Sequence, residues 1–161
     1  MKTLVISVDR SRQKRTIYAL VEVDYNNLRH IREKGSWLKH LAELPKQERR
    51  NYIAKFPGRF EKLKPYLEKI IITPFLSEIK DEVANKSENI RILILDDAVL
   101  KKFSEYSGQK NVFKESLAKR RYEFRHVVLL TDNLAYIGRE IYEKNPNPNA
   151  LKKELRKRGI L

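Results

Sequence analysis

The chain contains no cysteine, and this absence removes several classes of site at once. Without thiols there is no disulfide, no Cys-ligated zinc, no iron–sulfur cluster and no thiol catalysis. Only three histidines occur, His30, His40 and His126, and no two of them have the i, i+4 spacing of a helical zinc motif. A structural zinc site is therefore not expected.

Glycine is also scarce, with 5 residues in 161, and no glycine-rich phosphate loop is present. The glycines that flank a catalytic serine in a nucleophile elbow are missing too. Apolar runs are short. The longest, at 90–95 and 127–130, fall far below the roughly 18 residues needed to cross a bilayer. The first residues lack the apolar core of a signal sequence. We therefore expect a soluble, cytoplasmic protein.

Positive charge is what the chain has in excess. Lys and Arg number 35 against 21 Asp and Glu, which gives a formal net charge of +14. The hydrophobic fraction of 41% is enough for a core, so the charge belongs to a folded domain. The excess indicates a polyanionic partner, with nucleic acid first among the candidates. The charged fraction of 35% also resembles the composition of hyperthermophile proteins.

The hydrophobic pattern predicts an α/β fold. Two β-rich runs, 3–8 and 16–23, flank a polar segment that is too short for a crossover helix, so they should form an antiparallel hairpin. Further strands are predicted at 69–73, 90–95 and 126–130, and helices at 28–44, 47–56, 75–84, 98–106, 112–124 and 131–142. The alternation predicts a three-layer domain, with a mixed, mostly parallel sheet of about five strands and helices on both faces.

We expect one α/β domain over residues 1–144, with a helical insertion at about 28–68. The run Asn145-Pro146-Asn147-Pro148-Asn149 cannot continue a helix and marks the end of this domain. Residues 145–161 are then an Asn/Pro linker and a basic C-terminal tail.

Aspartates follow three of the predicted strands. The carboxyl ends of parallel strands meet at one edge of a sheet, which is where α/β proteins place their sites. The candidate catalytic residues are therefore Asp9, Asp96, Asp97 and Asp132. Such a cluster could hold Mg²⁺ or Mn²⁺, which prefer oxygen ligands and assist phosphoryl transfer. Helix capping and turn formation explain aspartates at the same positions without a metal.

The stretch from Ile92 to Glu140, in which an apolar run leads into Thr131-Asp132, resembles the C-terminal half of PIN-like nuclease domains. Residues 74–79 are similar to the segment in which that family carries a conserved glutamate. This resemblance implies the metal ligands Asp9, Glu78 and Asp132, with Glu115 standing in for an acid on the preceding helix. The opening hairpin is instead similar to RNase H-like folds, which share carboxylate-based metal chemistry and include non-catalytic, ribosome-associated members.

Basic residues gather in a hairpin loop, near the end of a late helix and in the tail. The candidate nucleic-acid-binding residues are Arg10, Arg12, Lys14, Arg15, Lys119, Arg120, Arg121, Arg125, Lys152, Lys153, Arg156, Lys157 and Arg158. Tyr122 and Phe124 are interleaved with the second cluster, where aromatic rings could stack on unpaired bases, and Tyr18 is a further stacking candidate. Each cluster alone is also compatible with a solvated helix face, or with cations at a helix C-terminus.

Three functions remain open from the sequence. The first is a nucleic-acid-binding α/β protein, with RNA preferred to DNA. The second is a nuclease that depends on Mg²⁺ or Mn²⁺ and uses the aspartates at the sheet edge. The third is a non-catalytic protein-interaction domain of a ribonucleoprotein complex.

Overall fold

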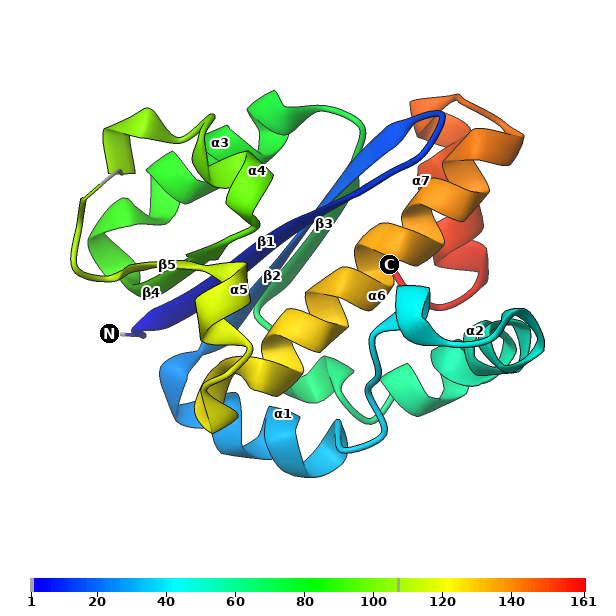
Figure 1. Cartoon of the computed structure of the whole chain (residues 1–161), viewed down its shortest axis with the longest axis horizontal. Coiled ribbons are helices and arrows are strands. Elements are labelled where there is room, and N and C mark those ends of the chain that lie inside the picture. Colours follow the sequence, from blue (N-terminus) through cyan, green and yellow to red (C-terminus); the bar gives the residue numbers. More distant parts are fainter. Residues whose placement is uncertain (1, 107) are drawn as a thin grey trace.

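The computed structural model describes residues 2–106 and 108–161, and a five-stranded sheet forms its centre (Figure 1). The strands are β1 (Leu4–Arg12), β2 (Thr16–Asp24), β3 (Lys69–Thr73), β4 (Ile90–Leu95) and β5 (Val112–Lys114). Their order is β3-β2-β1-β4-β5, and β2 alone runs against the other four. The predicted mixed, mostly parallel sheet with an N-terminal antiparallel hairpin is confirmed.

Helices cover both faces of the sheet. They are α1 (Leu28–Lys34), α2 (Lys46–Phe60), α3 (Leu76–Lys86), α4 (Asp97–Leu100), α5 (Glu115–Ala118), α6 (Tyr122–Lys144) and α7 (Pro148–Lys157). The long helix α6 crosses one face and shares a core with α1, α2 and α7, whereas α3 and α4 pack on the opposite face. The predicted three-layer architecture is therefore confirmed. No helix within the described ranges combines the length and apolarity needed to cross a membrane.

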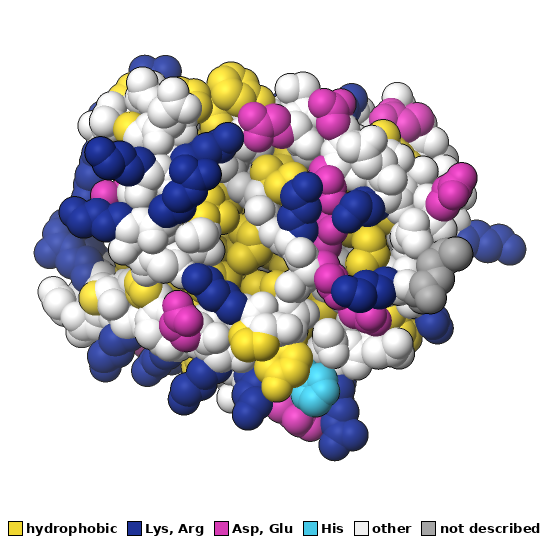
Figure 2. Space-filling view, turned by 180° about the vertical axis from the view of Figure 1, so that it is seen from behind, with side chains coloured by type: hydrophobic (Ala, Val, Ile, Leu, Met, Phe, Trp, Pro, Cys, Tyr) yellow, Lys and Arg dark blue, Asp and Glu magenta, His cyan; other side chains and the backbone are white. Residues whose placement is uncertain are grey.

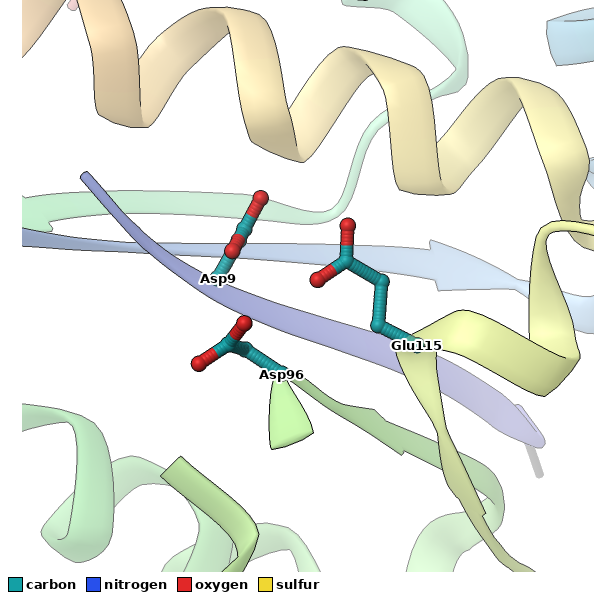
Figure 3. A group of neighbouring side chains, drawn as sticks. All are labelled: Asp9, Asp96 and Glu115. Carbon is teal, nitrogen blue, oxygen red and sulfur yellow. The ribbon is translucent and has the colours of Figure 1, made fainter. Parts of the chain in front are cut away.

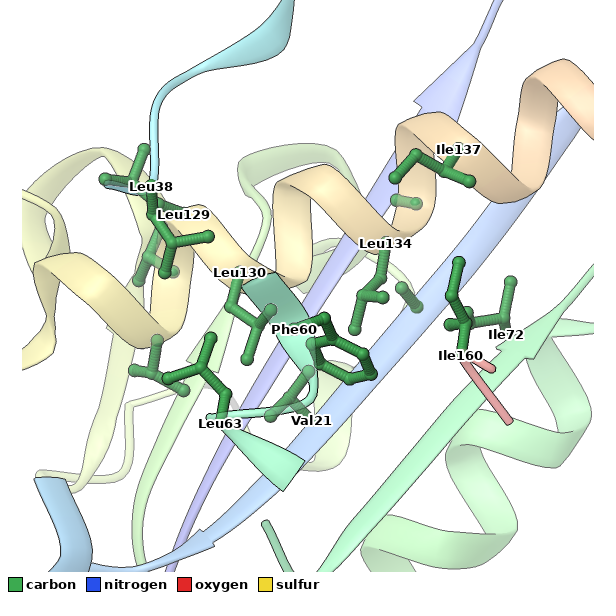
Figure 4. Close-up of a cluster of buried hydrophobic side chains, with 14 of the residues drawn as sticks. Val21, Leu38, Phe60, Leu63, Ile72, Leu129, Leu130, Leu134, Ile137 and Ile160 are labelled. Carbon is green, nitrogen blue, oxygen red and sulfur yellow. The ribbon is translucent and has the colours of Figure 1, made fainter. Parts of the chain in front are cut away.

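Two cores form because the central strands are buried on both sides. Alternate side chains of a strand point to opposite faces. In β1, Val5 faces the α6 core, while Leu4, Ile6 and Val8 face the core under α3 and α4. Figure 4 shows the α6 core, where Leu130, Leu134 and Ile137 of the helix lie above the sheet. This alternation also decides which polar residues of β1 lie beneath α6.

Two predictions around α6 are wrong. The apolar run 126–130, predicted as a strand, lies inside α6, and residues 112–124, predicted as a helix, contain the short strand β5 and the single turn α5. A short apolar run buried on all sides looks alike in sequence whether it is a strand or a helix. Thr131 and Asp132, predicted to open a helix, instead lie in the middle of one.

Other boundaries differ from the predicted ones by smaller amounts. The pattern predicts a helix that ends before Pro57, but α2 continues to Phe60. Proline in a helix removes a backbone hydrogen bond, and here the buried rings of Phe56 and Phe60, stacked at 5.3 Å, hold the last turn against the core. The helix predicted at 98–106 consists of α4 followed by a 3₁₀ turn, Ser104–Tyr106.

Residues 145–161, expected as a linker and tail, contain helix α7. The side chain of Asn147 caps this helix by accepting a hydrogen bond from the Ala150 N–H at 3.0 Å. Gly159 ends it with a φ of 80°, and the Ile160 N–H then donates to the Leu155 carbonyl, as in a Schellman motif. Leu151, Leu155 and Ile160 are buried in the α6 core. The apolar side of α7 is therefore packed, and its basic side is exposed.

Gly138 lets α6 approach the sheet closely. A Cβ atom at this position would lie 2.5 Å from Ile72 Cγ2 and 3.3 Å from Ile17 Cγ2. We expect Gly138→Ala to lower the free energy of unfolding by about 1–3 kcal/mol, as overpacking does in other cores. In α2, a Cβ atom on Gly58 would meet nothing within 4 Å, so Gly58→Ala should stabilise the protein by roughly 0.5–1 kcal/mol. Urea unfolding of both variants tests these two predictions. Equal changes in the free energy of unfolding would contradict the close approach of α6 to the sheet at Gly138.

Candidate active site

Asp9 and Asp96 lie side by side because β1 and β4 are parallel neighbours. The last register pair of these strands is Val8 with Leu95, and the Asp96 N–H donates to the Val8 carbonyl at 3.0 Å. Both aspartates follow that pair by one residue. Residues an even number of positions apart in a strand point to the same face. Asp9 is four residues after Val5, and Asp96 is two residues after Ile94, so both aspartates point to the face that α6 covers.

Glu115 joins them from the next strand. It follows β5 directly as the first residue of α5, and it has the parity of Phe113, which packs against the α6 core. Carboxylate oxygens of Asp9, Asp96 and Glu115 lie within 4.8 Å of one another (Figure 3). Asp9 is buried, with 5% of its surface exposed, and the other two are half-buried. Three elements far apart in sequence thus bring three acids together.

Asp132 approaches the same site from α6. It is not part of the tight group of three, but its charge raises the pKa of both Asp9 and Glu115. His40 Nε2 lies 3.8 Å from Asp132 Oδ1, and both His40 and the backbone N–H of Leu41 lower the pKa of this carboxyl group. The site therefore has a fourth acid, which is held by the segment between α1 and α2.

A buried hydrogen-bond network fixes that segment. The Asn133 side-chain amide donates to the Lys39 carbonyl at 2.8 Å and accepts from the Tyr52 hydroxyl. The Tyr52 hydroxyl in turn accepts from the Lys39 N–H at 3.1 Å. Asn133 is fully buried, and its side-chain amide also donates to Asp132 Oδ2 at 3.5 Å. The network connects α2, α6 and the segment next to Asp132.

Burial raises the pKa of three acids of the site, and neighbouring acids add to the effect for Asp9 and Glu115. Burial, followed by the charges of Glu115, Asp132 and Asp96, raises the pKa of Asp9 well above its usual value. Burial, with the charges of Asp96 and Asp132, raises the pKa of Glu115 to about 7. Burial raises the pKa of Asp132 as well. Like charges that share a site oppose one another's ionisation, so the cluster contains more negative charge than its surroundings balance.

Few cations offset this charge among the described residues. Arg10 Nε lies 3.5 Å from Asp96 Oδ2, and the Arg10 N–H donates to Asp9 Oδ1 at 2.7 Å. Lys119 is near enough to lower the pKa of both Glu115 and Asp132. Asp96 Oδ2 also accepts the N–H groups of Ala98 and Val99, which cap α4. The helix-capping explanation therefore applies to Asp96, but it does not account for the buried Asp9.

Two of the expected site residues lie elsewhere. Asp97 accepts a hydrogen bond from the Ser116 hydroxyl at 3.0 Å and is exposed, outside the tight group. Glu78 belongs to α3, whose buried residues Ile79 and Val83 pack on the opposite face of the sheet. The metal set implied by the PIN-like resemblance, Asp9, Glu78 and Asp132, is therefore not brought together.

Spacing in the sequence does not predict two of the residues near the site. Glu115 falls within a predicted long helix, because a strand of three residues has too few positions to show an alternating pattern. His40 is considered from the sequence only as a zinc ligand, and the histidine spacing excludes that role. Glu115 is two residues after Phe113 and therefore points to the same face of the sheet. This relation predicts its place only once Val112–Lys114 is known to be a strand.

The basic hairpin loop is attached to α6. Arg139, with 3% of its surface exposed, donates to the Ser11 hydroxyl at 2.8 Å and pairs with Glu143 at 2.9 Å. Glu143 also accepts the backbone N–H groups of Lys14 and Arg15. The side chains of Arg12, Lys14 and Arg15 remain exposed beyond this anchor. The loop therefore presents its charge from a fixed position.

The second basic cluster borders the acidic site. Lys119, Arg120 and Arg125 line a pocket of about 400 Å³, whereas Arg121 pairs with Glu123 at 2.6 Å and lies over Phe113 and Phe124. Of the three aromatic residues considered for stacking, Tyr122 is 68% exposed. Phe124 is buried in the α6 core, and Tyr18, 7% exposed, belongs to the core under α3. Tyr18 is therefore excluded as a stacking surface.

The third cluster lies on the exposed side of α7. Lys152, Lys153, Arg156 and Lys157 are exposed, and Arg158 pairs with Glu154 at 3.1 Å. Two hollows of about 480 Å³ each, one between α6 and α7 and one between α2 and α6, share Lys144 and are lined with further Lys and Arg side chains. Figure 2 shows basic side chains along the left edge of the rear view, the side on which α2 and α7 lie, while acidic side chains gather mainly to the right.

No family model matches the chain, and no curated protein matches its sequence. Among solved structures, the chain is similar to the ribonuclease H2 from Pyrococcus horikoshii OT3. The TM-score is 0.51 at 17% sequence identity, and the match covers 98% of this chain and 78% of that one. At this identity the likeness concerns the fold alone. The fold therefore resembles the RNase H-like fold, as the opening hairpin predicted, and the PIN-like resemblance is not supported.

Proposed function

We propose that this chain is a divalent-metal-dependent nuclease whose metal ligands are Asp9, Asp96, Glu115 and Asp132. The observation that carries the proposal is the convergence of three acids on adjacent parallel strands, under a helix that adds a fourth. Asp9 lies within β1, and Asp96 and Glu115 directly follow β4 and β5. The fold likeness to a ribonuclease H2 supports the same class of reaction.

The donor set fits Mg²⁺ or Mn²⁺. Every side chain in the cluster offers carboxylate oxygen, the ligand that these hard cations prefer, and the chain has no cysteine to favour a softer metal. Burial, followed by three neighbouring acids, raises the pKa of Asp9, so the ionised cluster has an excess of negative charge in a buried place. Such an excess is costly unless a cation balances it. A divalent cation bound there would neutralise phosphate charge and help to activate water.

The chain's own residues would position the substrate. The Arg10 guanidinium is already beside Asp96, and Lys119 is near enough to Glu115 and Asp132 to lower their pKa values. Both cations could contact the phosphates that flank the cleaved bond. The network of Asn133, Tyr52 and Lys39 would keep the Asp132 carboxylate in place. Such preorganised charges favour a transition state because they need not reorganise during the reaction.

Nucleic-acid binding follows from the basic surfaces in the same proposal. The exposed cations of the hairpin loop and of α7 belong to a chain with a net charge of +14. Lys and Arg side chains bind phosphates through a sequence-independent attraction that weakens with salt. These surfaces would therefore hold either RNA or DNA, while the carboxylates carry out the cleavage.

We expect the protein to cleave labelled RNA or DNA with Mn²⁺ or Mg²⁺ and to lose this activity in EDTA. Asp132→Asn should reduce the metal-dependent rate by about 100-fold or more, since the loss of a few kcal/mol of transition-state stabilisation has an effect of this size. Asp97→Asn is the matched control and should cleave as the wild type does, because Asp97 bonds to Ser116 instead. Cleavage that continues unchanged in EDTA would refute the proposal.

A further inference from the structure

A pocket of about 400 Å³ opens beside the acidic cluster. Its lining combines cations with apolar and aromatic surface, and consists of His40, Glu43, Lys119, Arg120, Tyr122, Arg125 and Leu129. A volume of this size is within the range of small-ligand sites. The pocket has one acid against three Lys and Arg side chains, so it favours an anionic occupant.

The pocket adjoins the proposed active site. His40 lines it and also lies 3.8 Å from Asp132. Lys119 also lines the pocket, and it is near enough to Glu115 and Asp132 to lower the pKa of both. Leu129 precedes Asp132 by three residues in α6, and residues at this spacing share one face of a helix. A strand whose phosphate reached the carboxylates would therefore have its neighbouring nucleotide next to this pocket.

Tyr122 gives the pocket an exposed aromatic ring. The residue is 68% exposed, more than any other large hydrophobic residue described as exposed. The Arg32 guanidinium lies 4.7 Å from the ring centroid, and His126 contacts the ring edge-on. These two neighbours hold the ring while most of it stays open to solvent. An exposed aromatic ring beside basic side chains is the arrangement on which single-stranded nucleic acids stack their bases.

We infer that this pocket binds one unpaired nucleotide of the substrate, with its base stacked on Tyr122 and its phosphates held by Lys119, Arg120 and Arg125. The inference deepens the proposed nuclease function and rests on it. A base in a duplex already stacks on its neighbours and cannot also stack on a side chain, so the pocket selects strands with an unpaired segment next to the cleaved bond.

Binding measured in EDTA tests the pocket separately from cleavage. The probes are a fluorescein-labelled oligouridine, an oligothymidine and a duplex of the same length, followed by anisotropy. We expect Tyr122→Ala to weaken binding of the unpaired strands about 10-fold, as the loss of one stacked base does, and Tyr122→Phe to restore most of it. Duplex binding, which depends on phosphate contacts, should change little. The ring is exposed, so neither variant should affect folding.

Phe75→Ala is the matched control, because Phe75 is another exposed aromatic residue, 48% exposed, at the start of α3 on the other face of the sheet. It should bind the unpaired strands as the wild type does. Equal binding by Tyr122→Ala and the wild type, or an equal loss with Phe75→Ala, would overturn the inference. Parallel cleavage with Mn²⁺ separates the two proposals: a wild type that binds unpaired strands through Tyr122 but never cleaves refutes the nuclease and not the pocket.

Discussion

Replacing Asp9 by Asn should reduce metal-dependent cleavage by about 1000-fold while raising the stability of the metal-free protein. The activity falls because Asp9 is the most buried acid of the cluster and lies on the strand that pairs with β4. The loss of a metal-ligand charge removes several kcal/mol of transition-state stabilisation, which corresponds to a factor of this size. Asparagine has nearly the same shape and can still accept the Arg10 N–H.

The gain in stability has an electrostatic cause. The pKa of Asp9 is raised by burial and by three neighbouring acids, so an ionised Asp9 opposes folding when no cation is bound. Active sites often retain such costs because function requires them. Thermal unfolding in EDTA and cleavage assays with Mn²⁺ measure the two effects on the same variant. A variant that is both inactive and markedly less stable would indicate a purely structural role for Asp9.

The second large effect concerns a buried pair of acids on the opposite face of the sheet. Glu22 of β2 is fully buried, and Glu82 of α3 is 5% exposed. Lys86 Nζ lies 3.4 Å from both carboxylates, and Lys69 Nζ lies 2.9 Å from Glu82. One oxygen of Glu22, Oε1, has no hydrogen-bond partner among the described residues. Burial, with Glu82 beside it, raises the pKa of Glu22 to about 7.

This pair should make the protein less stable as the pH rises from about 4.5 to about 7. In that range the folded protein keeps a proton on Glu22 that the unfolded chain, with a pKa near 4.5, has lost. Stability falls with pH wherever the folded state binds more protons. The stability contributed by the proton on Glu22 is fully present below the unfolded-state pKa and is lost above pH 7. It amounts to about 3 kcal/mol at most. Glu115, whose pKa is also raised to about 7, adds a change of the same sign.

Glu22→Gln should remove the Glu22 share of this dependence. Between pH 5 and pH 8 the stability of the variant should rise relative to the wild type by roughly 2–3 kcal/mol, because glutamine stays neutral throughout. Chemical unfolding at both pH values in EDTA gives the comparison. Glu88→Gln, at an exposed position between α3 and β4, is the control and should follow the wild type. If the stability of Glu22→Gln changes with pH in parallel with that of the wild type, the pKa of Glu22 is not raised.

Several features of this protein are local and could be predicted from the sequence. The strands at 69–73 and 90–95 agree with β3 and β4, and the opening hairpin agrees with β1 and β2, because each shows a β-rich pattern bounded by turn residues. The adjacency of Asp9 and Asp96 followed from strand direction. Asp96 follows the end of β4, and Asp9 follows the apolar part of β1, which continues to Arg12. The carboxyl ends of apolar strands meet at one edge of a parallel sheet.

The hydrophobic pattern could not distinguish a helix from a strand where a segment is buried on all sides. Residues 127–130 are apolar on every side because α6 lies between the sheet and the helices α1 and α2. Such a run has no polar face to reveal its period. The same error placed Glu115, which the PIN-like resemblance implies, on a helix and not at the end of a strand, since the true fifth strand has only three residues. Asp132 then entered the site from a helix and not from a strand end.

Composition and local pattern by themselves determined the absence of thiol chemistry, the positive charge and the hairpin that contains Asp9. Only the tertiary structure decided which acids meet, since it placed β5 beside β4, laid α6 over that edge, and left Asp97 and Glu78 outside the cluster. It also placed α7 on the core and brought His40 and Tyr122 to one pocket. The physical reason is that periodicity reports which side of an element is buried, whereas a site depends on which elements bury one another.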